Sequence, residues 1–364
     1  MKTKSMKPLS LLLAVLLLCS LFAGCSEADS SVSPGPSETA GAASPQDSGD
    51  SPSAPSDSEP TKIAFISYMA IDSAEFLQNL AAALEQFADD HSDSVEVKII
   101  EATQASEYEP KIRTACDAGY EIVITTYDSM AEATCAVSKD YPDVMFGILD
   151  GGIADIENYG NIEQFKLSRT ETAFLAGIVA GSVTETGRVG IVAGSDSGSI
   201  NEIVAGWQQG MRYVNPEIED IVSYANTFTD PTKGKELGLA LISQGCDIIG
   251  GAAGGTGVGV AQAAADSGTY YVAWDVHYED VVADLELGSA VNYFDKMVLA
   301  FIDNAMNGGF APGTTKIYGV AEGACAFDYL DNGLVSDEIK AAVSEAAEKI
   351  ASGEIIVESE PLHK

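Results

Sequence analysis

Hydrophobic and polar positions alternate along this chain so that strands and helices are predicted in turn from residue 61 onward. Short apolar runs bounded by turn residues indicate buried strands, and longer amphipathic stretches between them indicate helices. In the first half, strands are predicted over 63–67, 95–100, 121–126, 144–149 and 161–167, with helices over 73–91, 109–118 and 131–139. This order, with nearly continuous apolar strands, favours a parallel sheet with helices on both faces.

A second series of the same kind begins with a helix predicted over 172–183. Its strands are predicted over 189–193, 221–224, 246–249 and 271–274, and later come a helix over 296–306, a strand over 316–320 and a helix over 336–351. Two such series with late elements left over predict two similar lobes joined by more than one crossover. We place lobe one at 61–165 plus 292–312, and lobe two at 166–291 plus 313–357.

The stretch 226–264 is predicted to be the organising element of the second lobe. It reads as a polar loop, a helix that starts at Pro231 and stops at Gly245, a strand, a glycine turn and a second helix. Phe228 and the glycine turn lie just past strand ends, where open α/β sheets bind ligands. Four glycines would let the backbone approach another group closely before the next helix begins: Gly254, Gly255, Gly257 and Gly259.

The N-terminal region is predicted to be a signal peptide followed by a tether. Lysines at positions 2, 4 and 7 precede an apolar run over 9–22, which is too short to span a membrane. The run ends in Leu-Phe-Ala-Gly-Cys, which is similar to a bacterial lipobox, so residues 1–24 are expected to be removed and Cys25 lipidated. Residues 25–60 are rich in Ser and Pro and are expected to be disordered. An ordinary secretory signal with an incidental Cys25 is the alternative.

The chain is strongly acidic, with a formal net charge of −36. This charge argues against binding nucleic acid and fits either a solvated surface or an acidic face that docks on a transporter. Four cysteines remain beyond Cys25, with no Cys-x-x-Cys pair among them, and buried free thiols are expected; one disulfide is the alternative. These are Cys116, Cys135, Cys246 and Cys325.

Several segments in order resemble the basic membrane protein family, the PnrA-like lipoprotein receptors for purine nucleosides that feed ABC importers. They include FTDPTKGKELGLA, GCDII, AAGGTGVGV, PDVMFGILDG, ETAFLAGIVAG and YYVAWDV, and they extend from residue 62 to about 327. The resemblance implies a two-lobed type I periplasmic-binding-protein fold with a hinged cleft. It also implies a lipid-anchored protein outside the cytoplasm, a nucleoside-like ligand, and an ABC permease with its ATPase as partners.

The loops after the predicted strand ends carry aromatic side chains, which suit a flat ligand because bases stack on rings. They include Phe76, Phe228 and Trp274. By resemblance, Phe76 and Phe228 match the family's two stacking phenylalanines. Asp275 matches an aspartate that can accept hydrogen bonds from two ribose hydroxyls, and Gly255 would offer backbone N–H groups nearby.

Three positions depart from the family pattern. Leu77 replaces an asparagine, Glu132 an aspartate, and Asn292 a lysine near the sugar. Gln78, Glu132 and Asn292 are therefore expected as altered contacts, and the base preference stays open.

No catalytic or cofactor pattern emerges. The glycines at 255, 257 and 259 lack the third glycine of a dinucleotide fingerprint, which would fall at Val260. His277 and its acidic neighbours are interpreted as a solvated turn rather than a metal site. We expect a non-enzymatic receptor without cofactors; the alternatives are a receptor for a free base, a modified nucleoside or a sugar, and an exported nucleoside-processing enzyme.

Overall fold

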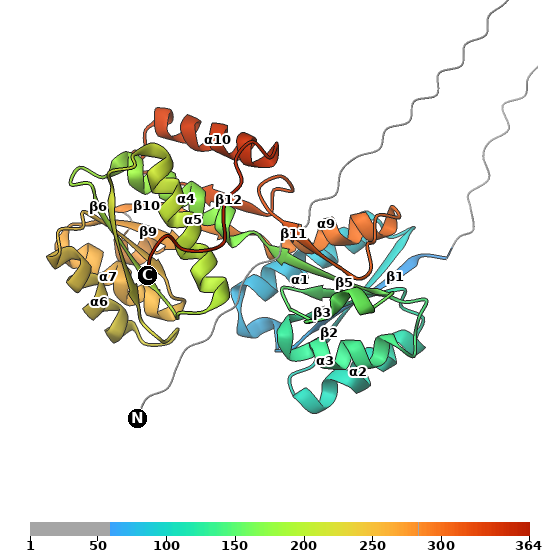
Figure 1. Ribbon diagram of the computed structural model, residues 1–364. Helices are drawn as coiled ribbons and strands as arrows, with labels where there is room; N and C mark the ends of the chain where they lie inside the picture. The colour runs from blue at the N-terminus through green and yellow to red at the C-terminus, as the bar shows by residue number, and fades with distance from the viewer. Residues whose placement is uncertain (1–58, 283) are drawn as a thin grey trace, which may run out of the picture. The chain divides into compact units, whose positions relative to one another are not determined.

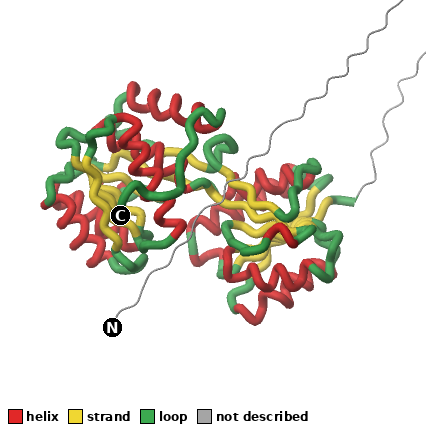
Figure 2. The backbone as a smooth tube through the Cα atoms, viewed as in Figure 1, coloured by secondary structure: helices red, strands yellow, loops and turns green. Residues whose placement is uncertain are grey.

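The computed structural model describes residues 59–282 and 284–364. The predicted signal peptide, Cys25 and nearly all of the predicted tether lie outside these residues. Within them the chain forms two sheets whose strands lie between helices (Figures 1 and 2). None of the helices in these ranges combines the length and the hydropathy that a membrane span needs.

The first sheet has six strands in the order β11-β5-β4-β3-β1-β2, and all neighbouring pairs are parallel. Its strands are β1 (Thr61–Ser67), β2 (Val95–Glu101), β3 (Ile122–Thr126), β4 (Met145–Leu149), β5 (Ile162–Leu167) and β11 (Thr314–Tyr318). Successive residues of β1 point to opposite faces, as the two-residue period of a strand requires: Phe65 and Ile66 belong to different core clusters.

Helices cover both faces of this first sheet. On one side lie α1 (Glu75–Asp90) and α9 (Phe294–Met306), and on the other lie α2 (Ala105–Asp117) and α3 (Tyr127–Ser138). Two short 3-10 turns, η1 (Ile71–Ser73) and η2 (Ile156–Asn158), join these elements. Because α9 comes late in the chain, the first lobe is built from two separate segments.

The second sheet has the order β12-β10-β9-β8-β6-β7. Its strands are β6 (Arg188–Ala193), β7 (Glu219–Tyr224), β8 (Ile248–Ala252), β9 (Tyr270–Trp274), β10 (Glu286–Asn292) and β12 (Cys325–Asp328). The helices on one face are α4 (Arg169–Val183), α5 (Gly198–Val214) and α10 (Asp337–Ala351); those on the other are α6 (Pro231–Ser243) and α7 (Gly255–Ser267), with α8 (Glu279–Val282) beside α7. All neighbouring pairs are parallel except β10 and β12.

The two sheets correspond strand by strand: β5 to β10, β4 to β9, β3 to β8, β1 to β6 and β2 to β7. The chain crosses between them three times, from β5 to α4, from β10 to α9 and from β11 to β12. The prediction of two parallel sheets flanked by helices and joined by several crossovers is confirmed.

One part of the predicted lobe assignment is wrong. Residues 313–318 were expected in lobe two, but β11 pairs in parallel with β5, from Thr314 opposite Glu163 to Tyr318 opposite Leu167. The strand lies at the edge of the first sheet and is half polar, so its local pattern carries no information about its partner. The antiparallel strand β12 was not predicted.

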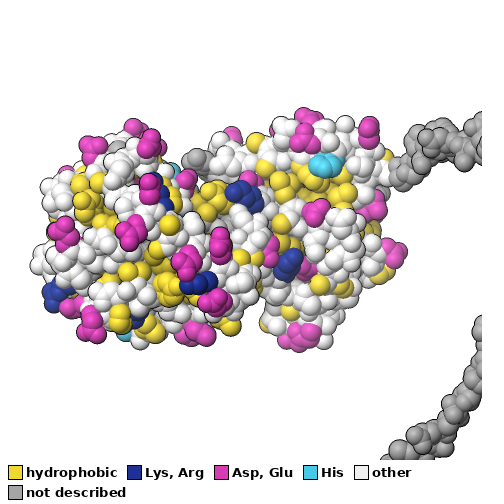
Figure 3. Space-filling model, turned by 90° about the horizontal axis from the view of Figure 1, so that it is seen from above, with side chains coloured by type: hydrophobic (Ala, Val, Ile, Leu, Met, Phe, Trp, Pro, Cys, Tyr) yellow, Lys and Arg dark blue, Asp and Glu magenta, His cyan; other side chains and the backbone are white. Residues whose placement is uncertain are grey.

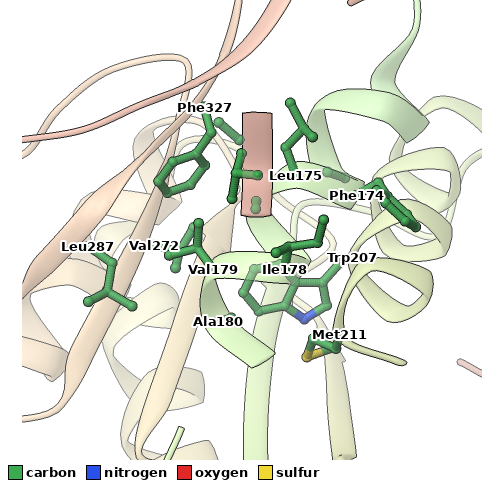
Figure 4. Packing of buried hydrophobic residues seen from close by; sticks show 14 of the residues in the cluster. Phe174, Leu175, Ile178, Val179, Ala180, Trp207, Met211, Val272, Leu287 and Phe327 are labelled. Carbon is green, nitrogen blue, oxygen red and sulfur yellow. The ribbon is translucent and has the colours of Figure 1, made fainter. Parts of the chain in front are cut away.

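The core of the second lobe reaches from its helices to the strand ends. Trp207 and Met211 of α5 pack with Phe174 of α4, over strand residues such as Val272 (Figure 4). The Trp207 ring also meets Trp274, the last residue of β9, edge to face at 5.6 Å. This packing fixes the carboxyl end of β9, where the candidate site begins.

Candidate ligand-binding site

Two aspartates follow corresponding strands in the two sheets. Asp150 comes directly after β4 and Asp275 directly after β9. Both have positive φ, 51° and 62°, and each donates its backbone N–H at 2.8 Å to the neighbouring strand, Asp150 to Phe165 O and Asp275 to Ala290 O. Positive φ is uncommon outside glycine and persists where the surroundings impose it. The same backbone geometry therefore holds both carboxyl groups.

Asp150 is neutralised by an arginine. Arg169, the first residue of α4, donates from Nη1 to Oδ1 at 3.1 Å and from Nη2 to Oδ2 at 2.5 Å. Only 5% of the Asp150 side chain and 20% of the Arg169 side chain are exposed. Such a two-pronged pair is strong and geometrically specific. It joins a lobe-one strand to a lobe-two helix and leaves Asp150 little capacity for a ligand.

Asp275 is held by an amide instead. Its Oδ1 accepts from Asn292 Nδ2 at 2.8 Å, and Asn292 Oδ1 accepts from Thr172 Oγ1 at 2.9 Å. Its Oδ2 has no hydrogen-bond partner among residues 59–282 and 284–364. Solvent reaches the side chain, yet the protein around it raises the pKa of Asp275 by desolvation, against the opposing effects of the Asn292 hydrogen bond and the Arg169 charge. Asp275 is thus oriented without being neutralised.

Two adjoining cavities meet at Asp275. The first, of about 320 Å³, is lined by Phe76, Asn79, Asp275, Val276, Val291, Asn292, Tyr293, Phe294 and Asp295. The second, of about 530 Å³, is lined by Leu167, Arg169, Ile200, Ile203, Phe228, Ala252, Ala253, Gly254, Gly255, Val258, Trp274, Asp275, Val276, Tyr278, Asn292 and Phe294. These volumes suit small molecules, and mostly apolar walls with a few oriented polar groups are typical of ligand sites.

The structure brings six of the eight predicted ligand-binding residues to these cavities. Phe76 lines the first cavity; Phe228, Gly255 and Trp274 line the second; Asp275 and Asn292 line both.

The remaining two predicted residues, Gln78 and Glu132, lie elsewhere. Gln78 is exposed and donates from Nε2 to Asp72 O at 3.1 Å. Glu132 is exposed on α3 and lines neither cavity. Leu77 is completely buried in the first lobe's core, because one helical step turns it from the cavity to the core.

The first cavity has an aromatic wall that comes from α1 and α9. The ring centroids of Phe76 and Phe294 lie 5.1 Å apart with the rings tilted by 43°, and those of Phe76 and Tyr127 lie 6.4 Å apart, edge to face. Phe294 is the first residue of α9 and lines both cavities. A flat ligand entering either cavity therefore meets this ring.

Phe228 presents its ring to the second cavity because glycine lies beneath it. A Cβ atom at Gly194 would be 2.0 Å from Phe228 Cε1, so only glycine leaves room for this ring position. The side chain is 43% exposed. A large hydrophobic side chain that remains this open beside a cavity is available for contact with a ligand.

The loop that carries Phe228 is anchored to the start of α7. Thr256 is fully buried; its N–H donates to Phe228 O at 3.3 Å, and its hydroxyl donates to Thr227 O at 3.2 Å. The N–H of Asp230 donates to the same hydroxyl at 3.0 Å, and Asp230 caps α6 by accepting from Lys233 N at 3.1 Å. The polar loop and the glycine turn are thus one unit, as the sequence predicts.

The glycines of the turn have two roles: some line the second cavity, and others let α7 pack closely against its neighbours. Gly254, with φ of 52°, and Gly255 line the second cavity. Gly257 and Gly259 lie inside α7, and a Cβ at Gly259 would be 1.8 Å from Pro231 O. The expected close approach of the backbone is thus found at Gly259 too, where it lets α6 and α7 pack closely.

The sequence prediction omits several residues that line these cavities, among them Asn79, Arg169 and Phe294. Asn79 lies three positions after Phe76 on α1, so helical periodicity could have indicated it. Arg169 and Phe294 are the first residues of the helices that follow crossover strands. No local pattern marks them, because their position depends on how the two lobes are connected.

His277 and the cysteines have structural environments in this fold. His277 Nδ1 lies 2.6 Å from Glu286 Oε1, and Nε2 lies 3.5 Å from Asp328 Oδ2. Within the described ranges, no three His, Cys, Asp or Glu side chains are arranged to hold a metal ion. The four cysteines beyond the N-terminal region are free and buried, which confirms the expected thiols.

Two largely parallel sheets joined by several crossovers are the architecture of the periplasmic-binding-protein fold. An ABC transporter system solute-binding protein from Conexibacter woesei shares this fold with a TM-score of 0.66 and 21% identity, over 82% of this chain and 99% of that one. The chain belongs to the family of PnrA-like ABC transporter substrate-binding proteins, because the model of that family matches residues 61–360. Proteins of this family bind small solutes and work with a permease and an ATPase; they are not a family of enzymes.

Curated relatives agree with this family. The CD4+ T-cell-stimulating antigen of Listeria monocytogenes is 30% identical over 312 residues, which are 80% of this chain and 86% of the relative. The ABC transporter nucleoside-binding protein BmpA of Lactococcus lactis is 29% identical over 276 residues, 71% of this chain and 77% of that protein.

Proposed function

We propose that this substrate-binding protein takes up a purine nucleoside at the two cavities and presents it to an ABC importer. The observation that carries the proposal is the oriented Asp275 carboxylate, flanked by the Phe76 and Phe294 wall on one side and the Phe228 ring on the other. A base needs flat apolar walls and a ribose needs an acceptor for its hydroxyls. The name of the Lactococcus relative supports a nucleoside.

The proposed contacts follow from the positions of these groups. Stacking of the base on aromatic rings contributes about 1–3 kcal/mol per ring, and Phe76 and Phe228 would supply it from different lobes. Asp275 would accept from two ribose hydroxyls, with Asn292 holding the carboxylate. The Gly255 N–H at the start of α7 would face the ligand, whereas the N–H groups of Thr256 and Gly257 already donate to Phe228 O and Gly254 O.

Ligand binding would favour a closed arrangement of the lobes, because only that arrangement lets both rings contact one base. A ligand shifts such an equilibrium by its difference in affinity for the two arrangements. For this purpose we assign lobe one to residues 61–167 plus 292–318 and lobe two to the remaining residues up to 357, with β11 placed by its pairing with β5.

We also propose that Cys25 carries a lipid anchor outside the cytoplasm and that residues 26–60 separate the binding domain from the membrane. The apolar run and the lipobox-like end of the predicted signal support this proposal. Expression of the full chain with Cys25→Ser should shift it from the membrane fraction to the soluble fraction. Continued membrane retention of this variant contradicts the anchor.

Isothermal titration tests the ligand class. Purified residues 59–364 are titrated with guanosine, inosine, adenosine, uridine, free purine bases and ribose, and each mixture is then analysed by chromatography for product. Saturable purine-nucleoside binding with unchanged ligand is the expected result. Tighter binding of a free base or sugar favours the alternative receptor, and cleavage into base and sugar favours an enzyme.

A further inference from the structure

The charged groups that line the two cavities do not balance. Their charged side chains are Asp275 and Asp295 on the acidic side and Arg169 on the basic side, and no lysine of the described residues lines either cavity. The Arg169 charge is already taken by Asp150 through two hydrogen bonds. Arg169 acts on Asp275 only at a distance, and neither Asp275 nor Asp295 forms an ion pair with a lysine or arginine of the described residues.

A lysine near the cavities does not supply that cation. Lys296 is exposed, and its Nζ lies 3.6 Å from the centre of the Tyr293 ring. It is not among the residues that line the first cavity, whereas Tyr293 is. The Lys296 ammonium group is therefore engaged by the Tyr293 ring and forms no ion pair with Asp275 or Asp295 among the described residues.

The hydrogen bonds around Asp275 orient its carboxylate but keep its charge. Thr172 donates to the Asn292 oxygen, which turns the Asn292 nitrogen toward Asp275 Oδ1. An amide is neutral, so it adds direction without adding positive charge. The second oxygen, Oδ2, keeps its full capacity to accept. A carboxylate in this position is stabilised most by a ligand group that both donates hydrogen bonds and carries positive charge.

The wider surface acts in the same direction. Asp and Glu side chains are spread over the face shown in Figure 3, with few Lys and Arg among them, and the formal net charge is −36. Such a field concentrates cations near the protein and repels anions. A phosphorylated ligand would meet this repulsion at the surface and again at Asp275 and Asp295.

We propose that Asp275, oriented by the neutral amide of Asn292, selects a nucleoside that carries a protonated amino group on its sugar over the neutral nucleoside, and excludes nucleoside monophosphates. The inference rests on the proposed nucleoside function and defines the substrate class of that same site. The ammonium group would occupy the free side of Asp275 at Oδ2. The aromatic walls would bind the base of either ligand equally, so the preference belongs to the sugar end.

The test compares three ligands with the same base. Calorimetry measures binding of adenosine, 3′-amino-3′-deoxyadenosine and adenosine 5′-monophosphate, and of the corresponding guanosine set, at a pH where the amine is protonated. For the wild-type chain the amino nucleoside should bind about tenfold more tightly than the parent, the difference expected when a charged donor replaces a neutral one. The monophosphate should bind more weakly than both.

Asn292→Lys supplies the missing cation and should reverse this order. The amino preference should fall to about one, or invert, while the monophosphate gains affinity. Gln86→Lys is the matched control, because it adds the same charge on α1 away from both cavities and next to Asp90, which Gln86 already contacts. This control should keep the wild-type order.

The outcomes separate the two proposals. If the wild-type protein binds the parent nucleoside as tightly as its amino analogue, or binds the monophosphate most tightly, the cation preference is overturned and the nucleoside function stands. If no nucleoside of either set binds, the proposed function fails and the cation preference fails with it. An unchanged order in a folded Asn292→Lys variant also overturns the role of Asp275.

Discussion

Asp150 and Asp275 occupy the same place in the two lobes and do opposite things. Both follow corresponding strands, both have positive φ, and both bond to the next strand at the same distance. Near Asp150, helix α4 begins with Arg169, which donates hydrogen bonds to both oxygens of the Asp150 carboxylate. At Asp275 the neighbouring strand β10 ends with Asn292, which only orients the carboxylate. The aspartate after β4 therefore stabilises the fold, and the aspartate after β9 remains available to a ligand.

The comparison shows that the fold sets the backbone conformation of both aspartates, and that one neighbouring side chain determines whether the carboxylate is free to bind a ligand. In this class of fold the carboxyl ends of parallel strands gather side chains from many segments. The buried Asp150 carboxylate is satisfied within the protein by an arginine, whereas the solvent-accessible Asp275 carboxylate has only an amide partner and keeps an oxygen for a ligand. The following changes test the two halves of this contrast, starting with the largest expected effect.

Removing the arginine should expose the structural role of Asp150. Arg169→Met leaves the buried Asp150 carboxylate without a counter-charge and should lower the free energy of unfolding by about 3–5 kcal/mol. Urea denaturation followed by circular dichroism measures it. Arg113→Met is the control, because Arg113 pairs with Glu109 and Asp140 at the surface, where such pairs contribute little to stability. Equal losses in the two variants would contradict a special role for the Asp150 pair.

Truncating the rings beside Asp275 should weaken binding while leaving the fold intact. Phe76→Ala and Phe228→Ala should each reduce nucleoside affinity by about 1–3 kcal/mol, or roughly 5- to 150-fold, through lost stacking. Calorimetry with the best nucleoside measures the change. Phe87→Ala removes a ring from α1 that contacts His91 and lines neither cavity, and its affinity should match wild type. Unchanged affinity in both cavity variants rules out stacking.

Adding one methyl group beneath Phe228 should give a smaller loss. Gly194→Ala places a Cβ where the Phe228 ring lies, so the ring must move, and overpacking of this kind costs about 1 kcal/mol or more. Nucleoside affinity should fall by less than in Phe228→Ala. Gly160→Ala is the control, since a Cβ there meets no atom within 4 Å. An affinity equal to wild type in Gly194→Ala would show that the ring position does not matter.

The smallest effect concerns stability and pH at Asp275. Burial raises the pKa of Asp275, so the folded state holds its proton more tightly than the unfolded state. The Asp275 carboxyl therefore contributes stability at low pH that is lost as the pH rises through the raised pKa. Asp275→Asn cannot ionise and should have a slightly higher Tm than wild type near neutral pH. That difference should shrink as the pH falls toward the ordinary pKa of aspartate.

Asp266→Asn provides a control of opposite sign. The hydrogen bond from Lys235 lowers the pKa of Asp266, so its ionised form stabilises the folded state above that pKa. The Asn variant should have a slightly lower Tm near neutral pH. Thermal melts of both variants across the same pH range test the pair, and shifts of the same sign in both would contradict the assignment for Asp275.

Much of the site could be predicted because it lies at strand ends that the sequence marks clearly. Phe228, Gly255, Trp274 and Asp275 follow or end apolar strands in the expected order, and proximity to the cavity follows from the parallel sheet. The polar loop before α6 and the start of α7 could also be predicted from the sequence, because Pro231 and the glycines determine the local backbone conformation.

The parts that could not be predicted depend on contacts between distant segments. The placement of β11 beside β5 joins positions about 150 residues apart and leaves no local trace. The Arg169 contact to Asp150 depends on the first crossover in the same way. Asn79 is a different case, because it follows Phe76 by three residues on α1 and a helix returns to the same face after three or four residues, not after one or two.

A crystal structure of the protein with the tightest-binding purine nucleoside tests the central claim most directly. The base should lie between the Phe76 and Phe228 rings, with a sugar group hydrogen-bonded to Asp275 and with Asp150 still paired to Arg169. A ligand bound away from both rings, or one held by Asp150 while Asp275 faces solvent, would contradict the account.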